Sequence, residues 1–119
     1  MQSYRDLKVW RLGMTISLKV YQVSAKFPPD ERFSLTNQLR RSAVSIPSNI
    51  AEGHARRSTK DMLRFLASAR GSLAEMETQL ILAKDLGYLT EAELAVILSL
   101  ADEESRMLSG LRKSLESKL

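Results

Sequence analysis

The segment from Ser58 to Leu86 is apolar at a spacing that alternates between three and four residues. This spacing places the side chains on one face of a helix, whereas a strand would alternate at every second residue. Asp61, three residues after Ser58, completes a helix-capping pattern, and Gly87 is well suited to follow a helix end. A helix of this length has to bury its apolar face against other helices. The residues of that face are Met62, Leu66, Ala69, Leu73, Met76, Leu80 and Ala83.

Three other segments have the same helical periodicity. The first extends from about Ser3 to Lys26 and must end before Pro28, because proline disfavours helix in the residue ahead of it. The second covers Ser34 to Gly53, and the fourth begins at Thr90. Short loops join these segments, and short loops force successive helices to lie antiparallel. We therefore predict an all-α fold, an antiparallel up-down-up-down four-helix bundle, formed by one domain over residues 1–119.

The second predicted helix contains a proline and ends on a glycine. Pro47 removes an amide donor and crowds the carbonyl of Ala43, so we expect a kink, but no new element, because the apolar pattern continues through it. Gly53 suits a helix C-cap. A polar stripe on the same helix is either a ligand site or a hydrogen-bonded seam between helices, and buried polar groups favour the seam. The stripe consists of Gln38, Ser42, Ser45, Asn49 and Glu52, with Glu52 spaced to pair with Arg56.

Positive charge is concentrated in the middle of the chain. Seven basic side chains against two acidic ones lie between residues 40 and 70, whereas the whole chain has a formal net charge of +4. Such asymmetry is typical of proteins that bind polyanions, although a solvated basic face is the simpler interpretation. We predict a nucleic-acid-binding surface that contacts the phosphate backbone. Its candidate residues are Arg40, Arg41, Arg56, Arg57, Lys60 and Arg64.

The first and fourth helices each carry a second apolar line, more than one four-helix core requires. An exposed apolar surface of this kind usually marks an interface, and symmetric homo-oligomers are the common result. The alternative is a wide face that is turned entirely towards the core. The candidate interface residues are Val9, Leu12, Ile16, Val20 and Val23 on the first helix, with Val96, Leu100 and Met107 on the fourth.

Nothing in the sequence indicates an enzyme. The chain has a single histidine, His54, and no cysteine, which argues against a histidine- or cysteine-ligated metal centre. Phosphate-binding loop motifs are missing, as is the Glu-x-x-His pattern of di-iron bundles. We predict no catalytic residue, no metal and no cofactor. The lack of cysteine, of a long apolar run and of a signal peptide favours the cytoplasm, without membrane contact.

Several motifs in this order resemble a known family: LKVW, QLRRSAVSIPSNIAEG, RRS, FLASARGSLAE and LGY. They resemble the bacterial four-helix bundle proteins encoded in intervening sequences of 23S ribosomal RNA genes, the S23-type proteins. The resemblance implies a cytosolic bundle and a ring of five subunits. It extends to the accessory variability proteins of retroelements, which use a basic bundle surface to engage nucleic acid and a reverse transcriptase. Two functions remain open: binding of nucleic acid, with RNA first, or a scaffold that docks an acidic partner protein.

Overall fold

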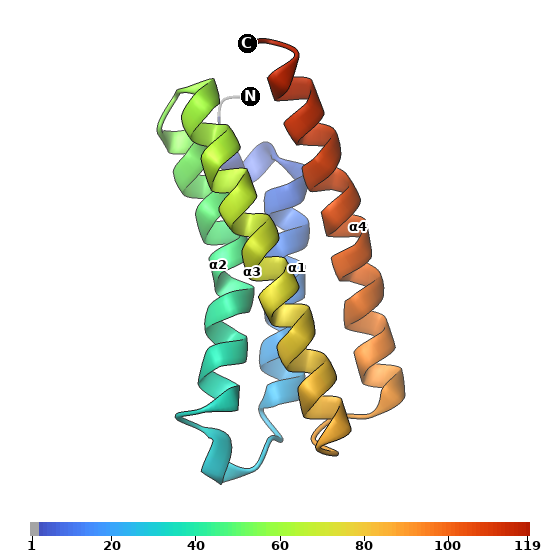
Figure 1. The fold of residues 1–119 in the computed structure, drawn as a ribbon. Helices are drawn as coiled ribbons and strands as arrows, with labels where there is room; N and C mark the ends of the chain where they lie inside the picture. Colours follow the sequence, from blue (N-terminus) through green and yellow to red (C-terminus); the bar gives the residue numbers. More distant parts are fainter. Residues whose placement is uncertain (1–2) are drawn as a thin grey trace.

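The computed structural model describes residues 3–119, and in this range every regular element is helical. Four long helices form an elongated bundle of 46 × 24 × 20 Å (Figure 1). The predicted all-α class with four helices is confirmed. The long helices are α1 (Lys8–Ser24), α2 (Leu35–Ala55), α3 (Thr59–Asp85) and α4 (Glu91–Glu116), and the short 3₁₀ turns are η1 (Tyr4–Asp6) and η2 (Pro29–Glu31).

Each long helix packs on two neighbours. α2 lies beside α1 and α3, α4 lies beside the same two helices, and within the described residues the backbones of the diagonal pairs are not neighbours. Successive helices run in opposite directions, so the end of α2, the start of α3 and the end of α4 lie at the same end of the bundle (Figure 1). This end carries most of the predicted basic residues.

The helix starts follow the capping signals in part. Ser58 accepts a hydrogen bond from the amide of Asp61 at 3.2 Å, and Thr90 forms a reciprocal capping box with Glu93. The predicted start of the first helix at Ser3 is wrong. Ser3 caps only η1, and Leu7 is extended, so α1 begins at Lys8.

The core contains the apolar line of α1 that we assigned to a subunit interface. Val9, Ile16, Val20 and Val23 are buried within the subunit, so they cannot form that interface. Leu12, with Leu100 and Met107 of α4, is partly buried against this core, and only Val96 is half exposed. Both apolar lines of α1 fit the helical period, and hydrophobicity alone does not say which one faces the bundle axis.

α2 passes through Pro47 as one helix, and a neighbouring helix replaces the missing hydrogen bond. Proline has no amide hydrogen, which leaves the carbonyl of Ala43 without its helical donor. The hydroxyl of Ser17 on α1 lies 3.1 Å from this carbonyl oxygen and 3.0 Å from the carbonyl oxygen of Gly13. The single hydroxyl hydrogen is shared by the two oxygens, so the buried carbonyl that proline leaves free has a donor within hydrogen-bond distance.

Gly53 does not cap α2, which continues to Ala55; that prediction is wrong. The residue is buried, and a Cβ atom at this position would lie 2.7 Å from Cβ of Phe65 and 3.0 Å from the sulfur of Met62. The chain turns instead at Arg57, whose φ of 55° lies in the left-handed region. Glycine at residue 53 thus permits the close approach of α2 and α3.

Part of the polar stripe of α2, Ser42 and Ser45, forms the predicted seam, whereas Asn49 bonds within α2 and Glu52 pairs with Arg56. The hydroxyl of Ser42 lies 2.8 Å from Oε1 of Gln79, and the hydroxyl of Ser72 donates to that of Ser45 at 2.9 Å. Asn49 donates to the carbonyl oxygen of Ser45 at 2.7 Å. The seam joins α2 to α3, which favours its structural interpretation over a ligand site.

Candidate nucleic-acid interface

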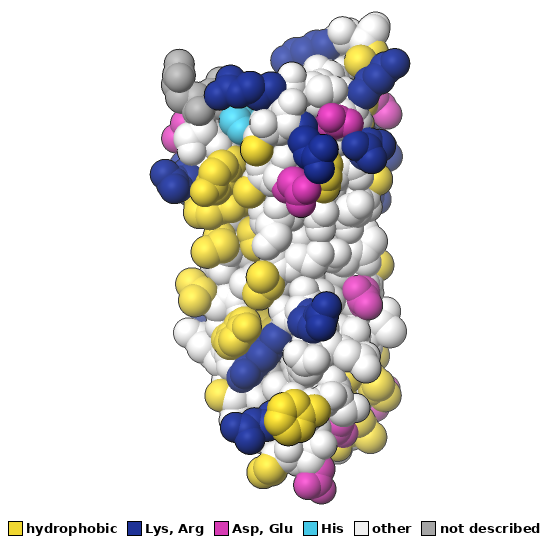
Figure 2. Space-filling view, turned by 90° about the vertical axis from the view of Figure 1, so that its left-hand side faces the viewer, with side chains coloured by type: hydrophobic (Ala, Val, Ile, Leu, Met, Phe, Trp, Pro, Cys, Tyr) yellow, Lys and Arg dark blue, Asp and Glu magenta, His cyan; other side chains and the backbone are white. Residues whose placement is uncertain are grey.

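Four of the predicted basic residues lie together where α2 ends and α3 begins. We call Arg56, Arg57, Lys60 and Arg64 the bundle-end cluster. All four are exposed, and Lys and Arg side chains gather at this end of the molecule in Figure 2. Lys60 and Arg64 are one helical turn apart on α3, which places them on the same face.

Two cations of the bundle-end cluster are paired and two are not. Arg56 lies 3.1 Å from Glu52, as predicted, and Arg64 lies 2.7 Å from Asp61. No carboxylate lies within 4.0 Å of Arg57 or Lys60 in the part of the chain that the structure describes. Exposed ion pairs are weak, so the positive charge of the whole cluster remains open to an anionic partner.

The C-terminal end of α4 adds a cation that the sequence prediction omitted. A shallow groove of about 440 Å³ at this end is lined by His54, Arg57 and Lys118, together with Ser58, Thr59 and apolar residues. Lys118 lies far from the basic segment in sequence. The predicted up-and-down topology places the end of the fourth helix near the start of the third. This was the signal that could have added Lys118 to the predicted site.

Arg40 and Arg41 do not belong to this cluster. They precede Arg56 by about four helical turns, which is roughly 24 Å at 1.5 Å per residue. Nε of Arg40 donates to the hydroxyl of Ser24 at 2.8 Å, and the guanidinium lies 4.5 Å from the ring centre of Tyr21. The predicted basic surface therefore consists of two separate sites.

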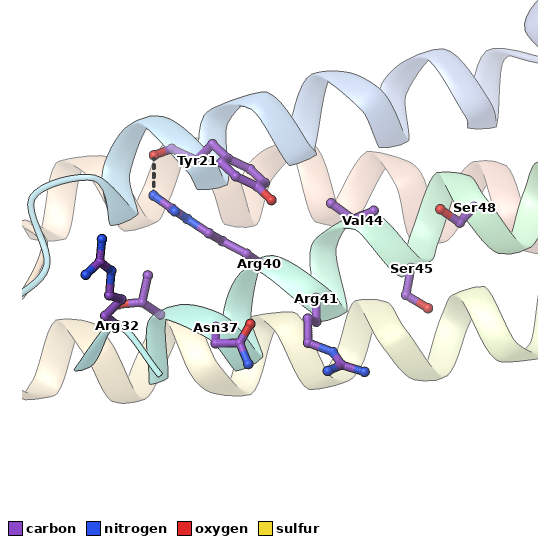
Figure 3. Close-up of a pocket in the computed structure, with 9 residues that line it drawn as sticks. Tyr21, Arg32, Asn37, Arg40, Arg41, Val44, Ser45 and Ser48 are labelled. Carbon is purple, nitrogen blue, oxygen red and sulfur yellow. Dashed lines mark hydrogen bonds between the residues drawn. The ribbon is translucent and has the colours of Figure 1, made fainter. Parts of the chain in front are cut away.

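The second site is an open groove of about 440 Å³ on the outer face of α1 and α2 (Figure 3). Three arginines line it and no acidic residue does. We call it the arginine groove. Its lining residues are Tyr21, Arg32, Thr36, Asn37, Arg40, Arg41, Val44, Ser45 and Ser48.

An apolar surface adjoins the arginine groove on the same two helices. We call Met14, Leu18, Tyr21 and Val44 the apolar patch; their exposed fractions are 40, 62, 45 and 41%. They border a hollow of about 310 Å³ between α1 and α2, whose base includes Pro47. Figure 2 shows hydrophobic side chains running along this side of the bundle. This patch, not the buried line through Ile16, is the exposed apolar surface of α1.

Glu104 on α4 is an ionisable group that the sequence analysis missed. Its side chain is fully buried, and neither carboxyl oxygen has a hydrogen-bond partner in the described structure. Burial, with a smaller contribution from the charge of Glu103, raises the pKa of Glu104 to about 8. A Cβ atom at Gly13 would lie 3.1 Å from Oε2 of Glu104, so α1 and α4 approach closely here. The position of Glu104 on the core-facing side of α4, in line with Ile97 and Leu108, was the available signal.

The described residues hold no group of three or more His, Asp and Glu side chains that could bind a metal. None of their helices combines the length and the apolar character needed to cross a membrane. The described residues thus carry two separate groups of exposed cations, the bundle-end cluster and the arginine groove, and an apolar patch that adjoins the groove. These features define the chain as a basic, all-helical bundle protein.

Comparison with known proteins identifies the family. The family model of the 23S rRNA-intervening sequence proteins matches residues 5–110, and the chain belongs to this family. A protein of unknown function from the S23 ribosomal protein family of Bacteroides thetaiotaomicron, solved at 1.70 Å resolution, has a similar fold. The TM-score is 0.81 with 23% identity, over 88% of this chain and 98% of that chain. No match is found among curated proteins.

Proposed function

We propose that this protein is a non-enzymatic, cytoplasmic homo-oligomer that binds nucleic acid, with RNA as the first candidate, through the bundle-end cluster. The observation that carries the proposal is the position of Arg57 and Lys60 at one exposed end, without carboxylate partners among the described residues. Guanidinium groups donate in a fork that matches phosphate oxygens, and the start of α3 adds a favourable helix dipole.

Binding at the bundle-end cluster is to the phosphate backbone. The aromatic ring near the cluster, Phe65, is partly buried, with the guanidinium groups of Arg56 and Arg64 at 5.2 and 5.7 Å from its centre. It is therefore not free to stack on bases. Contacts of this kind are steeply dependent on salt and weakly specific for sequence.

The first expected result concerns Arg57 and Lys60. Changing both to alanine removes two phosphate contacts, so the slope of log affinity against log salt for single-stranded RNA becomes less steep by about 1.4. Fluorescence anisotropy with a labelled RNA oligonucleotide across a salt series measures this. A Lys19→Ala/Arg106→Ala variant removes the same charge from exposed positions elsewhere and should keep the slope. Equal losses in both variants would assign the effect to net charge and reject the site.

The apolar patch supports the part of the proposal that concerns self-association. The chain exposes four large apolar side chains together on α1 and α2, and contiguous patches of this kind favour an interface. In the ring of five subunits that the family resemblance implies, each antiparallel bundle would repeat its bundle-end cluster. Repetition raises the effective affinity for one long polyanion.

The interface is tested with Leu18→Asp, which places a charge in the apolar patch. We expect the native mass, measured by light scattering, to fall to that of a single chain, because an unpaired charge is costly to bury. Ile81→Asp is the matched control on α3, where the side chain is exposed to 45%. Val96→Asp tests the one half-exposed residue of the interface that we predicted from the sequence. Wild-type protein that is monomeric, or Leu18→Asp protein that retains its mass, would contradict this interface.

A second function remains a candidate because of the same apolar patch. A scaffold would use the patch, together with the basic residues, to dock an acidic partner protein; a reverse transcriptase is another candidate partner. If the wild-type protein binds neither RNA, single-stranded DNA nor heparin at about 50 mM salt, the scaffold is favoured.

A further inference from the structure

The arginine groove differs from the bundle-end cluster because an exposed aromatic ring lies beside one of its cations, whereas Phe65 beside the cluster is partly buried. Phe33, in the turn before α2, is exposed to 87%, and the guanidinium of Arg32 lies 5.6 Å from its ring centre. Arg40 lies over the ring of Tyr21 on α1, but Tyr21 belongs to the apolar patch, so Phe33 is the ring that stays open to a base. Exposed aromatic rings next to arginines are the elements from which single-stranded nucleic acid sites are built.

The cations of the groove are not neutralised by ion pairs. Arg40 is held by neutral partners: its guanidinium donates to the hydroxyl of Ser24 at 2.8 Å and to the carbonyl oxygen of Tyr21 at 3.5 Å. Figure 3 shows the second of these contacts. Arg32 and Arg41 are exposed, and no carboxylate of the described residues lies within 4.0 Å of either. The groove therefore presents one guanidinium held by hydrogen bonds, that of Arg40, and two exposed ones without ion pairs.

Two nearby acidic side chains, Glu31 and Glu75, are engaged elsewhere or lie outside the groove, and no acidic residue is among those that line it. Glu31 accepts a hydrogen bond from the hydroxyl of Tyr88 at 2.9 Å and one from the amide of Leu35 at 3.4 Å. Glu75 borders the neighbouring hollow that Arg41 also lines, but does not border the groove itself. The local charge of the groove is thus positive.

Thr36 provides a second observation at the same place. Its side chain is 8% exposed, yet its hydroxyl has no hydrogen-bond partner among the described residues. It lines both the arginine groove and the adjoining hollow, and Arg32 and Arg40 line the same two. Buried hydroxyl groups normally have a partner. A structural tie between α1 and α2 would explain Arg40, but it explains neither Thr36 nor the exposure of Phe33.

We propose that the arginine groove binds one nucleotide unit, with its phosphate between Arg32, Arg40 and Arg41 and its base stacked on Phe33. The inference rests on the proposed function in taking a nucleic acid strand as the source of that unit. It goes beyond the proposed function because it assigns a separate site, one that contacts a base as well as a phosphate. A free nucleotide has the same chemistry, and the test separates the two sources.

The test uses the full chain and a fluorescein-labelled single-stranded RNA decamer, with anisotropy as the readout. In Arg32→Ala/Arg41→Ala, we expect a salt slope less steep by about 1.4, because two phosphate contacts are lost. In Phe33→Ala, we expect binding to weaken roughly five- to a hundred-fold, because stacking on one base is lost. The variants Lys19→Ala/Arg106→Ala and Ile81→Ala, at exposed positions of other faces, should bind as the wild type does.

A second decamer with abasic residues isolates the stacking contact. Phe33→Ala should then bind this probe as well as the wild type does, whereas an equal loss on both probes would overturn the assignment of the base to Phe33. If Arg32→Ala/Arg41→Ala binds RNA normally while Arg57→Ala/Lys60→Ala does not, the groove inference fails and the proposed function stands. If the wild type binds no RNA but binds labelled AMP in a manner that requires Phe33, the proposed function fails. The groove is then a site for a free nucleotide, and inorganic phosphate as competitor should displace it.

Discussion

We expect the wild-type protein to lose much of its stability as the pH rises from 4.5 to 8, and Glu104→Gln should abolish this loss. The pKa of Glu104 is about 8 in the folded protein, against 4.5 for an ordinary glutamate. Between these values the folded state holds a proton that the unfolded state has released, so folding is favoured by low pH. The contribution is complete below pH 4.5, falls through the window and is gone above pH 8. It amounts to about 4–5 kcal/mol of unfolding free energy.

The measurement is chemical denaturation at pH 5, 7 and 9, at one fixed protein concentration. Glutamine has nearly the same shape as glutamic acid but cannot ionise, so the variant isolates the effect of charge. Glu103→Gln is the matched control. Glu103 is exposed, and removing its charge slightly lowers the pKa of Glu104, so most of the pH dependence should persist. Parallel stability curves for the wild type and Glu104→Gln would show that Glu104 does not titrate in this window.

Gly53→Ala should destabilise the protein, although alanine is the better helix former. An added Cβ atom would lie 2.7 Å from Cβ of Phe65, which is closer than non-bonded carbon atoms approach one another in proteins. Cβ of Phe65 is fixed to its backbone and cannot rotate away, so α2 and α3 must move apart. Overpacking of this kind costs about 1–3 kcal/mol. We expect a lower denaturation midpoint with an unchanged dependence on denaturant concentration.

Gly71→Ala is the control for the intrinsic effect of the substitution. Gly71 lies inside α3, and an added Cβ atom would meet nothing within 4 Å. The free energy of unfolding of this variant should be about 0.5–1 kcal/mol higher than that of the wild type, because glycine weakens a helix relative to alanine. If Gly53→Ala were also stabilising, then the approach of α2 to α3 would not depend on glycine.

Most of the fold could be predicted from the sequence because the signals are local. Periodicity located the helices, and the caps at Ser58 and Thr90 located two of their starts. The wrong predictions concern residues whose role is set by contacts with another helix. Glycine is common at helix ends, which led to the wrong prediction for Gly53. Its actual role, to let α2 pack closely on α3, depends on Phe65, which lies on that other helix.

The sequence predicted which basic residues are candidates for the site, but not which of them lie together in the folded protein. The six basic residues are close enough in sequence to suggest one surface, but about four turns of α2 separate Arg40 and Arg41 from Arg56. Phe33 was not assigned a role, because its near-complete exposure cannot be read from a single aromatic residue in a turn. The apolar patch was missed for a related reason: Leu18 and Ile16 belong to two equally apolar lines of one helix, and only packing shows which line is covered.

The bond from Ser17 to the carbonyl of Ala43 also limits how α1 can slide along α2. Pro47 leaves one specific carbonyl free, and Ser17 is the side chain that lies within hydrogen-bond distance of it. A shift of α1 by one helical turn, about 5.4 Å, would move the hydroxyl away and leave that buried oxygen without a donor. Apolar contacts alone tolerate such shifts, because successive turns of the helix present similar apolar side chains. The proline in α2 therefore defines the register of the helix pair.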